Sequence, residues 1–276
     1  MQIDARGMRF EVTVGGPEHG EPLLLLHGFP QHSGEWNDVL PTLHAGGLRS
    51  YALDQRGYSP GARPAAVEAY RLAELVADAV AVLDALGVDA AHVVGHDWGA
   101  VVGWALAAGH PDRVRTLTAV SVPHPAAMAY ALAEDPQQKA RSAYMMLFRR
   151  QGVAEKTLLA LNAGGLRRLL RGVGDAARTA AYVEPMREPG ALTAALNWYR
   201  AMSRTDLAAV GPVTVPTTFV WSDRDPAIGR AAAEACAGQV RGDYRFVELA
   251  GVGHWIPDQV PTPLAETILA RVRSTA

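Results

Sequence analysis

The stretch that decides the fold is Val93-Val94-Gly95-His96-Asp97-Trp98-Gly99-Ala100, where Gly-x-Asp-x-Gly follows one apolar run and precedes another. A tight turn from strand to helix strains its central residue, and glycines two positions away on each side let the flanking segments approach. We therefore expect the Asp97 side chain at the carboxyl edge of a sheet, beside a helix N-terminus that favours negative charge. The alternative is an ordinary aspartate that caps a helix.

A carboxylate at this turn predicts a particular chemistry. A serine hydroxyl needs a base to become nucleophilic, whereas the carboxylate of Asp97 is already ionised at neutral pH. A carboxylate attacks an sp³ carbon that bears a leaving group, and the product is an alkyl ester. This nucleophile suits epoxides and alkyl halides better than amides or ordinary esters. We predict that Asp97 is the nucleophile of a hydrolytic enzyme.

Two later segments offer the partners that such a nucleophile needs, in the chain order nucleophile, acid, histidine. The run Val220-Trp221-Ser222-Asp223-Arg224-Asp225-Pro226 follows a predicted strand, and Gly251-Val252-Gly253-His254-Trp255 follows the last one. His254 would accept a proton from water, and a carboxylate would orient its ring. Asp223 competes for the role of this acid, and we favour Asp225.

The loop His27-Gly28-Phe29-Pro30 ends a leucine-rich run and predicts an oxyanion hole. One backbone N–H comes from this loop and one from the residue after the nucleophile, so we assign Phe29 and Trp98. We expect the side chains of Trp36, Trp98 and Phe29 to line an apolar substrate pocket.

The rest of the chain predicts an α/β fold with a mostly parallel central sheet and helices on both faces. Short apolar runs alternate with helical patterns, as βα units do. The expected strands are Met8–Val14, Pro22–Leu26, Arg49–Leu53, Ala91–Val94, Val114–Val120, Val215–Trp221 and Tyr244–Leu249. The expected helices in this part are Ala69–Leu86, Ala100–Ala108 and Pro263–Arg273.

Between residues 126 and 209 the pattern is helical and contains no convincing strand. We therefore predict a core domain formed by residues 1–125 and 210–276, interrupted by a helical cap domain at 126–209.

Composition restricts the class of protein. The 276 residues are 49% hydrophobic and 20% charged, with a formal net charge of −2, which gives no reason to expect nucleic acid or an anionic membrane as partner. The start lacks the layout of a signal peptide, and Cys236 is the only cysteine, so we predict a cytoplasmic protein. His96, His110 and His124 lack metal-like spacing together, and we interpret them as structural. No GxGxxG occurs, so we predict neither a metal nor another cofactor.

The chain resembles the epoxide hydrolases of the α/β-hydrolase fold superfamily, in the branch with an aspartate nucleophile that lies close to the haloalkane dehalogenases. The matching segments span nearly the whole chain: His27–Pro30 (HGFP), Asp54–Tyr58 (DQRGY), Gly95–Ala100 (GHDWGA), Ser121–Pro125 (SVPHP), Asn197–Arg200 (NWYR) and Gly253–Trp255 (GHW).

This resemblance implies two cap tyrosines that donate hydrogen bonds to the epoxide oxygen. Tyr199 matches one through the NWYR segment, and Tyr144 matches the other through its distance from Gly-Val-Ala-Glu at 152–155. An opened epoxide leaves an alkoxide that needs a proton, and a phenol has a suitable pKa.

The predicted function is hydrolysis of a small apolar epoxide by water to a vicinal diol, through an alkyl ester on Asp97 that His254 and Asp225 help to hydrolyse. One alternative is a haloalkane or haloacid dehalogenase with the same nucleophile. However, haloalkane dehalogenases usually carry Asn or Glu where Phe29 stands, and fluoroacetate dehalogenases carry Arg where Trp98 stands. A second alternative is a non-catalytic ligand-binding protein of the same fold. The sequence leaves open which epoxide is used and whether the protein is a monomer or a homodimer.

Overall fold

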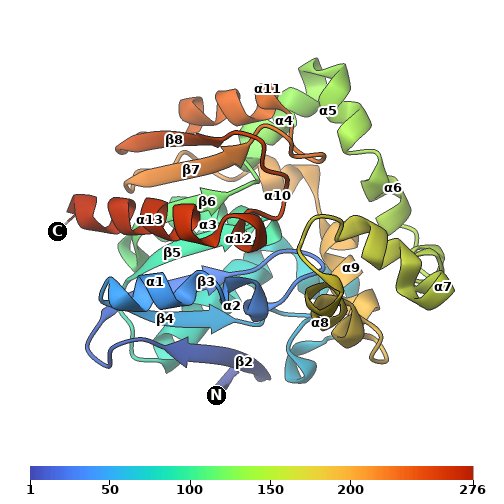
Figure 1. The fold of residues 1–276 in the computed structure, drawn as a ribbon, viewed down its shortest axis with the longest axis horizontal. Helices are drawn as coiled ribbons and strands as arrows, with labels where there is room; N and C mark the ends of the chain where they lie inside the picture. The colour runs from blue at the N-terminus through green and yellow to red at the C-terminus, as the bar shows by residue number, and fades with distance from the viewer. Residues whose placement is uncertain (276) are drawn as a thin grey trace.

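A computed structural model describes residues 1–275 and contains an eight-stranded sheet with helices on both sides (Figure 1). The strand order is β1-β2-β4-β3-β5-β6-β7-β8. The strands are β1 (Gln2–Ala5), β2 (Met8–Gly15), β3 (Glu21–Leu26), β4 (Leu48–Leu53), β5 (Ala91–His96), β6 (Val114–Val120), β7 (Thr217–Ser222) and β8 (Tyr244–Leu249). The α/β fold class predicted from the sequence is confirmed.

Parallel pairing brings the carboxyl ends of the central strands to one edge of the sheet. β3 to β8 pair in parallel, while β1 and β2 are antiparallel additions at one side. Leu26 at the end of β3 pairs with Gly95, and Val120 at the end of β6 pairs with His96 and Val220. The loops after these strands therefore meet at one place, as expected for ligand sites in open parallel sheets.

The run Leu23–Leu26 shows why a central parallel strand reads as continuously apolar. All four leucines are fully buried, but they alternate between faces. Leu24 and Leu26 belong to a cluster with α2 and α3, whereas Leu23 and Leu25 belong to a cluster with α1 and α13. Both faces of β3 are covered by helices, so no polar position is needed in the strand.

The helices outside the insertion cover the two faces of the sheet. α2 packs on α3 at one face, and α1 packs on α13 at the other. These helices are α1 (Leu40–Ala45), α2 (Leu72–Ala85), α3 (Trp98–Gly109), α11 (Arg230–Glu234), α12 (Ile256–Gln259) and α13 (Pro261–Val272). Short 3-10 helices lie at η1 (Ser33–Trp36), η2 (Pro60–Ala62), η3 (Val67–Tyr70), η4 (Pro111–Arg113), η5 (Ala235–Gln239) and η6 (Arg273–Thr275).

Every element between β6 and β7 in the described chain is helical, as the sequence predicted. These helices are α4 (Pro125–Glu134), α5 (Pro136–Arg141), α6 (Tyr144–Phe148), α7 (Val153–Leu169), α8 (Ala176–Met186), α9 (Ala191–Ala201) and α10 (Arg204–Ala208). In Figure 1, α5 to α9 lie to the right, beyond the ends of the strands. We call α5 to α9 the cap helices. α4 instead packs against α11 and η5.

Candidate active site

The turn after β5 holds Asp97 in strained backbone geometry. Its φ of 52° and ψ of −117° lie outside the regions that a non-glycine residue normally adopts. The flanking glycines are required because a Cβ on Gly95 would lie 2.1 Å from the Gly99 carbonyl oxygen, and one on Gly99 would lie 1.9 Å from the Leu26 carbonyl oxygen. Both would collide with backbone. Strain of this kind costs about 1–3 kcal/mol and persists where the surrounding structure enforces it.

The Asp97 carboxylate has a different partner on each oxygen. The backbone N–H of Phe29 donates to Oδ1 at 2.9 Å, and Nε2 of His254 lies 3.4 Å from Oδ2. A Cβ on Gly28 would lie 2.4 Å from the Asp97 Cβ, which explains the glycine in the His-Gly-Phe-Pro loop. Burial alone would raise the pKa of Asp97, but hydrogen bonding and charge from His254 lower it. The carboxylate is therefore ionised and available for attack.

Asp225, rather than Asp223, holds the ring of His254. Nδ1 of His254 lies 2.7 Å from Asp225 Oδ2, and Asp225 Oδ1 accepts the backbone N–H groups of Ala227 and Ile228. Asp223 is exposed, and its carboxylate accepts the N–H of Gly251. The choice of Asp225 as the partner of His254 agrees with this geometry.

His254 lies between two carboxylates, which controls its charge. Burial would lower its pKa, but Asp225 and Asp97 raise the pKa to about 10. The imidazole is therefore protonated while Asp97 is a free carboxylate. Conversion of Asp97 to a neutral ester would remove one of the two negative charges, so the pKa of His254 would fall and the ring could accept a proton.

Tyr144 on α6 and Tyr199 on α9 lie in the wall of one cavity with Asp97. Their ring centroids are 6.5 Å apart, and the Tyr199 ring lies 5.2 Å from that of Trp98. Burial, together with nearby charge that includes Asp97, raises the pKa of both phenols. Both hydroxyls therefore stay protonated and can donate a proton or a hydrogen bond.

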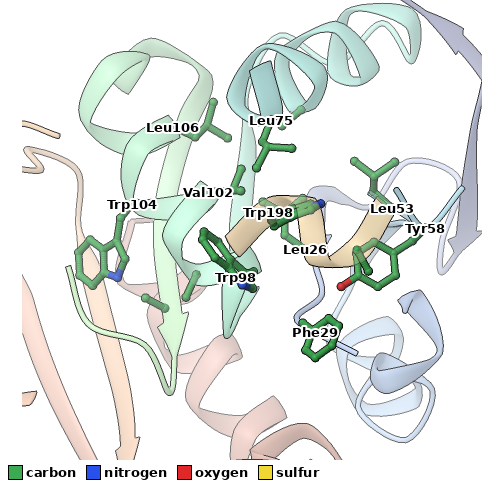
Figure 2. Close-up of a cluster of buried hydrophobic side chains, with 14 of the residues drawn as sticks. Leu26, Phe29, Leu53, Tyr58, Leu75, Trp98, Val102, Trp104, Leu106 and Trp198 are labelled. Carbon is green, nitrogen blue, oxygen red and sulfur yellow. The ribbon is translucent and has the colours of Figure 1, made fainter. Parts of the chain in front are cut away.

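Trp198 fixes α9, and with it Tyr199, against the core. Its indole N–H donates to the carbonyl oxygen of Arg56 at 2.9 Å. Its ring lies 5.6 Å from that of Trp98 and 6.2 Å from that of Tyr58, and Figure 2 shows these rings gathered with Phe29 in one cluster. The tryptophan of the Asn-Trp-Tyr-Arg segment thus anchors the cap helix that carries the tyrosine.

The cavity over Asp97 has a volume of about 700 Å³. Trp98 lines it, as predicted. The ring of Phe29 is not in its lining and packs behind Tyr199 at 5.4 Å. The prediction that Trp36 lines the substrate pocket is wrong, because its side chain is fully buried in the cluster with α1 and α13. Trp36 lies on a short 3-10 helix, where sequence periodicity does not show which way a side chain points.

Comparison with known proteins agrees with the fold. The family model described as alpha/beta hydrolase fold matches residues 21–260. The chain belongs to the α/β-hydrolase fold family. Epoxide hydrolase A of Mycobacterium tuberculosis is 33% identical, over 97% of this chain and 95% of that protein. The Bacillus subtilis AB hydrolase superfamily protein YfhM is 31% identical over 99% and 97% of the two chains.

A solved member of this fold superposes closely. The crystal structure of a Bacillus megaterium epoxide hydrolase in complex with an inhibitor matches with a TM-score of 0.90 and 27% identity, covering 99% of this chain and 100% of that one.

One buried polar pair beside Asp97 was not predicted from the sequence. Oε2 of Glu35 lies 3.2 Å from Nδ1 of His96, and both side chains are fully buried. Burial raises the pKa of Glu35 to about 7, and the Glu35 carboxylate raises that of His96 against the effect of burial. No sequence pattern distinguishes Glu35 from a solvated glutamate, and His96 had been interpreted as structural.

This pair and two serines hold the loop of His254. Nε2 of His96 lies 3.0 Å from the carbonyl oxygen of His254, and the Ser121 hydroxyl donates to the same oxygen at 2.9 Å. The Ser222 hydroxyl donates to the Gly253 carbonyl oxygen at 2.7 Å. Three side chains from β5, β7 and the residue after β6 therefore fix the backbone that carries His254.

Two features are absent from residues 1–275. No group of three or more His, Cys, Asp and Glu side chains is placed to hold a metal ion. No helix in this range has both the length and the apolar character needed to cross a membrane.

Proposed function

We propose that this α/β-hydrolase-fold protein is an epoxide hydrolase that forms a covalent ester on Asp97. The observation that carries the proposal is an ionised carboxylate facing the same cavity as two protonated phenols, Tyr144 and Tyr199. A carboxylate supplies the nucleophile, and phenols supply the proton that an opening epoxide ring needs. The relatives named epoxide hydrolase support the same activity.

In the first step, an oxygen of Asp97 forms a bond to one epoxide carbon as the bond from that carbon to the ring oxygen breaks. The electron pair of the breaking bond goes to the ring oxygen, which takes a proton from Tyr144 or Tyr199. A hydroxyalkyl ester of Asp97 and a phenolate result. His254 remains a cation in this step, which helps to keep Asp97 ionised.

In the second step, the His254 cation first releases its proton to solvent, because the neutral ester of Asp97 lowers the pKa of the ring. The neutral ring then takes a proton from water, and the hydroxide oxygen attacks the carbonyl carbon of the Asp97 ester. The backbone N–H groups of Phe29 and Trp98 are proposed to stabilise the resulting oxyanion. The bond between the carbonyl carbon and the alkyl oxygen then breaks. The diol leaves with a proton returned from His254, and the acidic proton left on the Asp97 carboxyl group passes to His254, which restores the carboxylate and the imidazolium. The phenolate formed in the first step is reprotonated by solvent. One oxygen from water stays in the carboxylate of Asp97.

A His254→Gln variant tests the proposal. It keeps the nucleophile and both tyrosines, so a reactive epoxide should add its mass to the peptide that contains Asp97 and the adduct should persist. Failure to detect the adduct by mass spectrometry would count against the scheme.

Isotope labelling of the wild type gives a second test. One turnover in water enriched in heavy oxygen should place the label in the Asp97 carboxylate, which can be located by peptide mass spectrometry. Label that appears only in the diol after one turnover would indicate direct attack of water on the epoxide and contradict the ester.

A substrate panel separates epoxide hydrolysis from dehalogenation with the same nucleophile. Styrene oxide and aliphatic epoxides should give diols, whereas chloroalkanes and bromoalkanes of the same length should release little halide. Halide release without diol formation from any epoxide would contradict the proposed function.

A further inference from the structure

We infer that Arg149 and Arg204 recognise an anionic group on the substrate, at the end remote from the epoxide ring. The substrate class is then an amphiphilic epoxide with an apolar body and a terminal carboxylate or similar anion. This inference rests on the proposed function and names the substrates of the same site.

The cavity is large and has mostly apolar walls. Its volume of about 700 Å³ lies in the upper part of the usual range for small-molecule sites, roughly 300–1,000 Å³. Methionines contribute much of its wall, and flexible thioether side chains adapt to extended apolar chains. These methionines are Met128, Met145, Met146 and Met202.

Only three charged residues line this cavity in the described chain. The acidic residue is buried, whereas the two basic residues are exposed. Asp97 is the one acid and lies buried at the inner end. Arg149 and Arg204 are the two bases, and both are exposed. A site for a neutral substrate has no need of two cations at its opening.

Neither arginine is neutralised by a carboxylate. Within residues 1–275, no acidic side chain lies within ion-pair distance of Arg149 or Arg204, and these two are the arginines that line the cavity. The one side-chain hydrogen bond of Arg149 goes to the carbonyl oxygen of Met202, at 3.3 Å. Most of the N–H donors of both guanidinium groups therefore remain available for an anion.

Arg149 and Arg204 are exposed residues of the cavity wall, and we call this part of the wall the rim. Arg149 follows the end of α6, and Arg204 is the first residue of α10. The hydrogen bond from Arg149 to Met202 brings the end of α6 to a point two residues before Arg204. One anionic group at this rim can therefore be shared by both side chains.

The distance along α6 between Tyr144 and Arg149 indicates how far the anion lies from the epoxide ring. Tyr144 is the first residue of α6, five positions before Arg149, so the helix rises about 7.5 Å between them. An anion at the rim is thus separated from the epoxide by a spacer of several carbons. The negative charge of Asp97 repels the anion from the inner end, so the two signs together orient the epoxide ring toward Asp97.

A matched pair of substrates tests this inference. The probe is a medium-chain fatty acid with an epoxide at its far end, compared with its neutral N-methylamide of the same length. We expect the wild type to convert the acid with a kcat/KM about tenfold higher than the amide, because charged hydrogen bonds at a partly exposed site are modest. The advantage should shrink as salt is raised, since both arginines are exposed.

The variant that removes both charges is Arg149→Gln with Arg204→Gln, and we expect its acid-to-amide ratio of kcat/KM to fall about tenfold, mainly through KM. The control is Arg150→Gln with Arg168→Gln, which makes the same change in net charge at exposed positions outside the cavity lining. The control should keep the wild-type ratio. An unchanged ratio in the first variant, or an equal fall in the control, would overturn the inference.

This design separates two failures. If the wild type forms a diol from the amide but shows no preference for the acid, the charge recognition is wrong and the proposed function stands. If neither probe, nor any epoxide of the panel above, gives a diol, the proposed function itself is wrong.

Discussion

The turn around Asp97 and the cap helices that carry Tyr144 and Tyr199 are held in place by different kinds of contact. At the turn, backbone segments approach so closely that Gly95 and Gly99 admit no side chain, and the carboxylates accept backbone N–H groups. In the cap, the tyrosines are positioned by rings, with Tyr199 at 5.0 Å from Phe148 and 5.2 Å from Trp98.

This difference predicts that the turn positions the reacting groups and that the cap controls which substrates bind. Contacts through the backbone tolerate almost no displacement, which suits groups that form and break bonds. Contacts between side chains can repack when the cap shifts or a residue changes, which suits a surface that chooses among substrates. We therefore expect substitutions near Asp97 to reduce activity severely. Substitutions in the cap should reduce activity by smaller and more varied amounts.

The largest expected effect distinguishes the two acids near His254. Asp225→Asn removes the negative charge that orients the His254 ring and keeps it protonated. We expect turnover to fall about 10⁴-fold, as for the acid of other triads. Asp223→Asn keeps an oxygen that can accept the Gly251 N–H, so its turnover should stay within about twofold of the wild type. Steady-state diol formation measures both, and similar losses would show that Asp225 is not the specific partner.

Loss of both cap hydroxyls should have the next largest effect. Tyr144→Phe with Tyr199→Phe keeps the ring packing but removes the proton donors, so we expect alkylation of Asp97 to slow by about 10³-fold. Rapid-quench mass spectrometry of the ester measures this step directly. Tyr130→Phe is the control, since Tyr130 is 57% exposed and lies outside the cavity lining. Alkylation at the wild-type rate in the double variant would remove the tyrosines from the mechanism.

The two regions should also differ in their tolerance of a methyl group. A Cβ on Gly99 would lie 1.9 Å from the Leu26 carbonyl oxygen, so Gly99→Ala should lower the free energy of unfolding by about 3 kcal/mol or more. Gly164 in the cap follows the break in α7 at Ala160–Ala163 and has no left-handed φ. A Cβ on Gly164 meets only the Leu161 Cβ, at 3.7 Å, so Gly164→Ala should stabilise by about 0.5–1 kcal/mol. Urea unfolding measures both, and equal effects would contradict the comparison.

The smallest expected effect is a shift in the titration of His254. Asp97→Asn mimics the neutral ester, so the pKa of His254, raised to about 10 by its carboxylates, should fall by about one unit or more. NMR of the imidazole measures the shift. The raised pKa of His254 stabilises the fold below about pH 6.5, and this contribution is lost as the pH rises through about 10. Between these two pH values the free energy of unfolding should therefore fall less in Asp97→Asn than in the wild type. An unchanged pKa would show that Asp97 does not hold the charge on His254.

Much of the fold could be predicted, and the failures have physical causes. β6 and β8 begin and end at the predicted residues because their apolar runs are bounded by turns. β1 was missed because four residues at an edge carry little pattern. The predicted helix 69–86 is divided, since Arg71 has extended backbone between η3 and α2. The domain boundaries at 126 and 209 remain a prediction, and α4 packs against α11 and η5 from inside the predicted cap.

The sequence by itself determined that Asp97 stands at a tight turn, and the chain order of Asp97, Asp225 and His254. Those features depend on local spacing, because glycines two residues from Asp97 already dictate how a strand must turn into a helix. Only the tertiary structure decided that Glu35 pairs with His96, that Trp36 lies outside the cavity lining, and that Arg149 and Arg204 both line the cavity. Each of these depends on contacts between segments distant in the chain, for which burial and side-chain direction leave no local pattern.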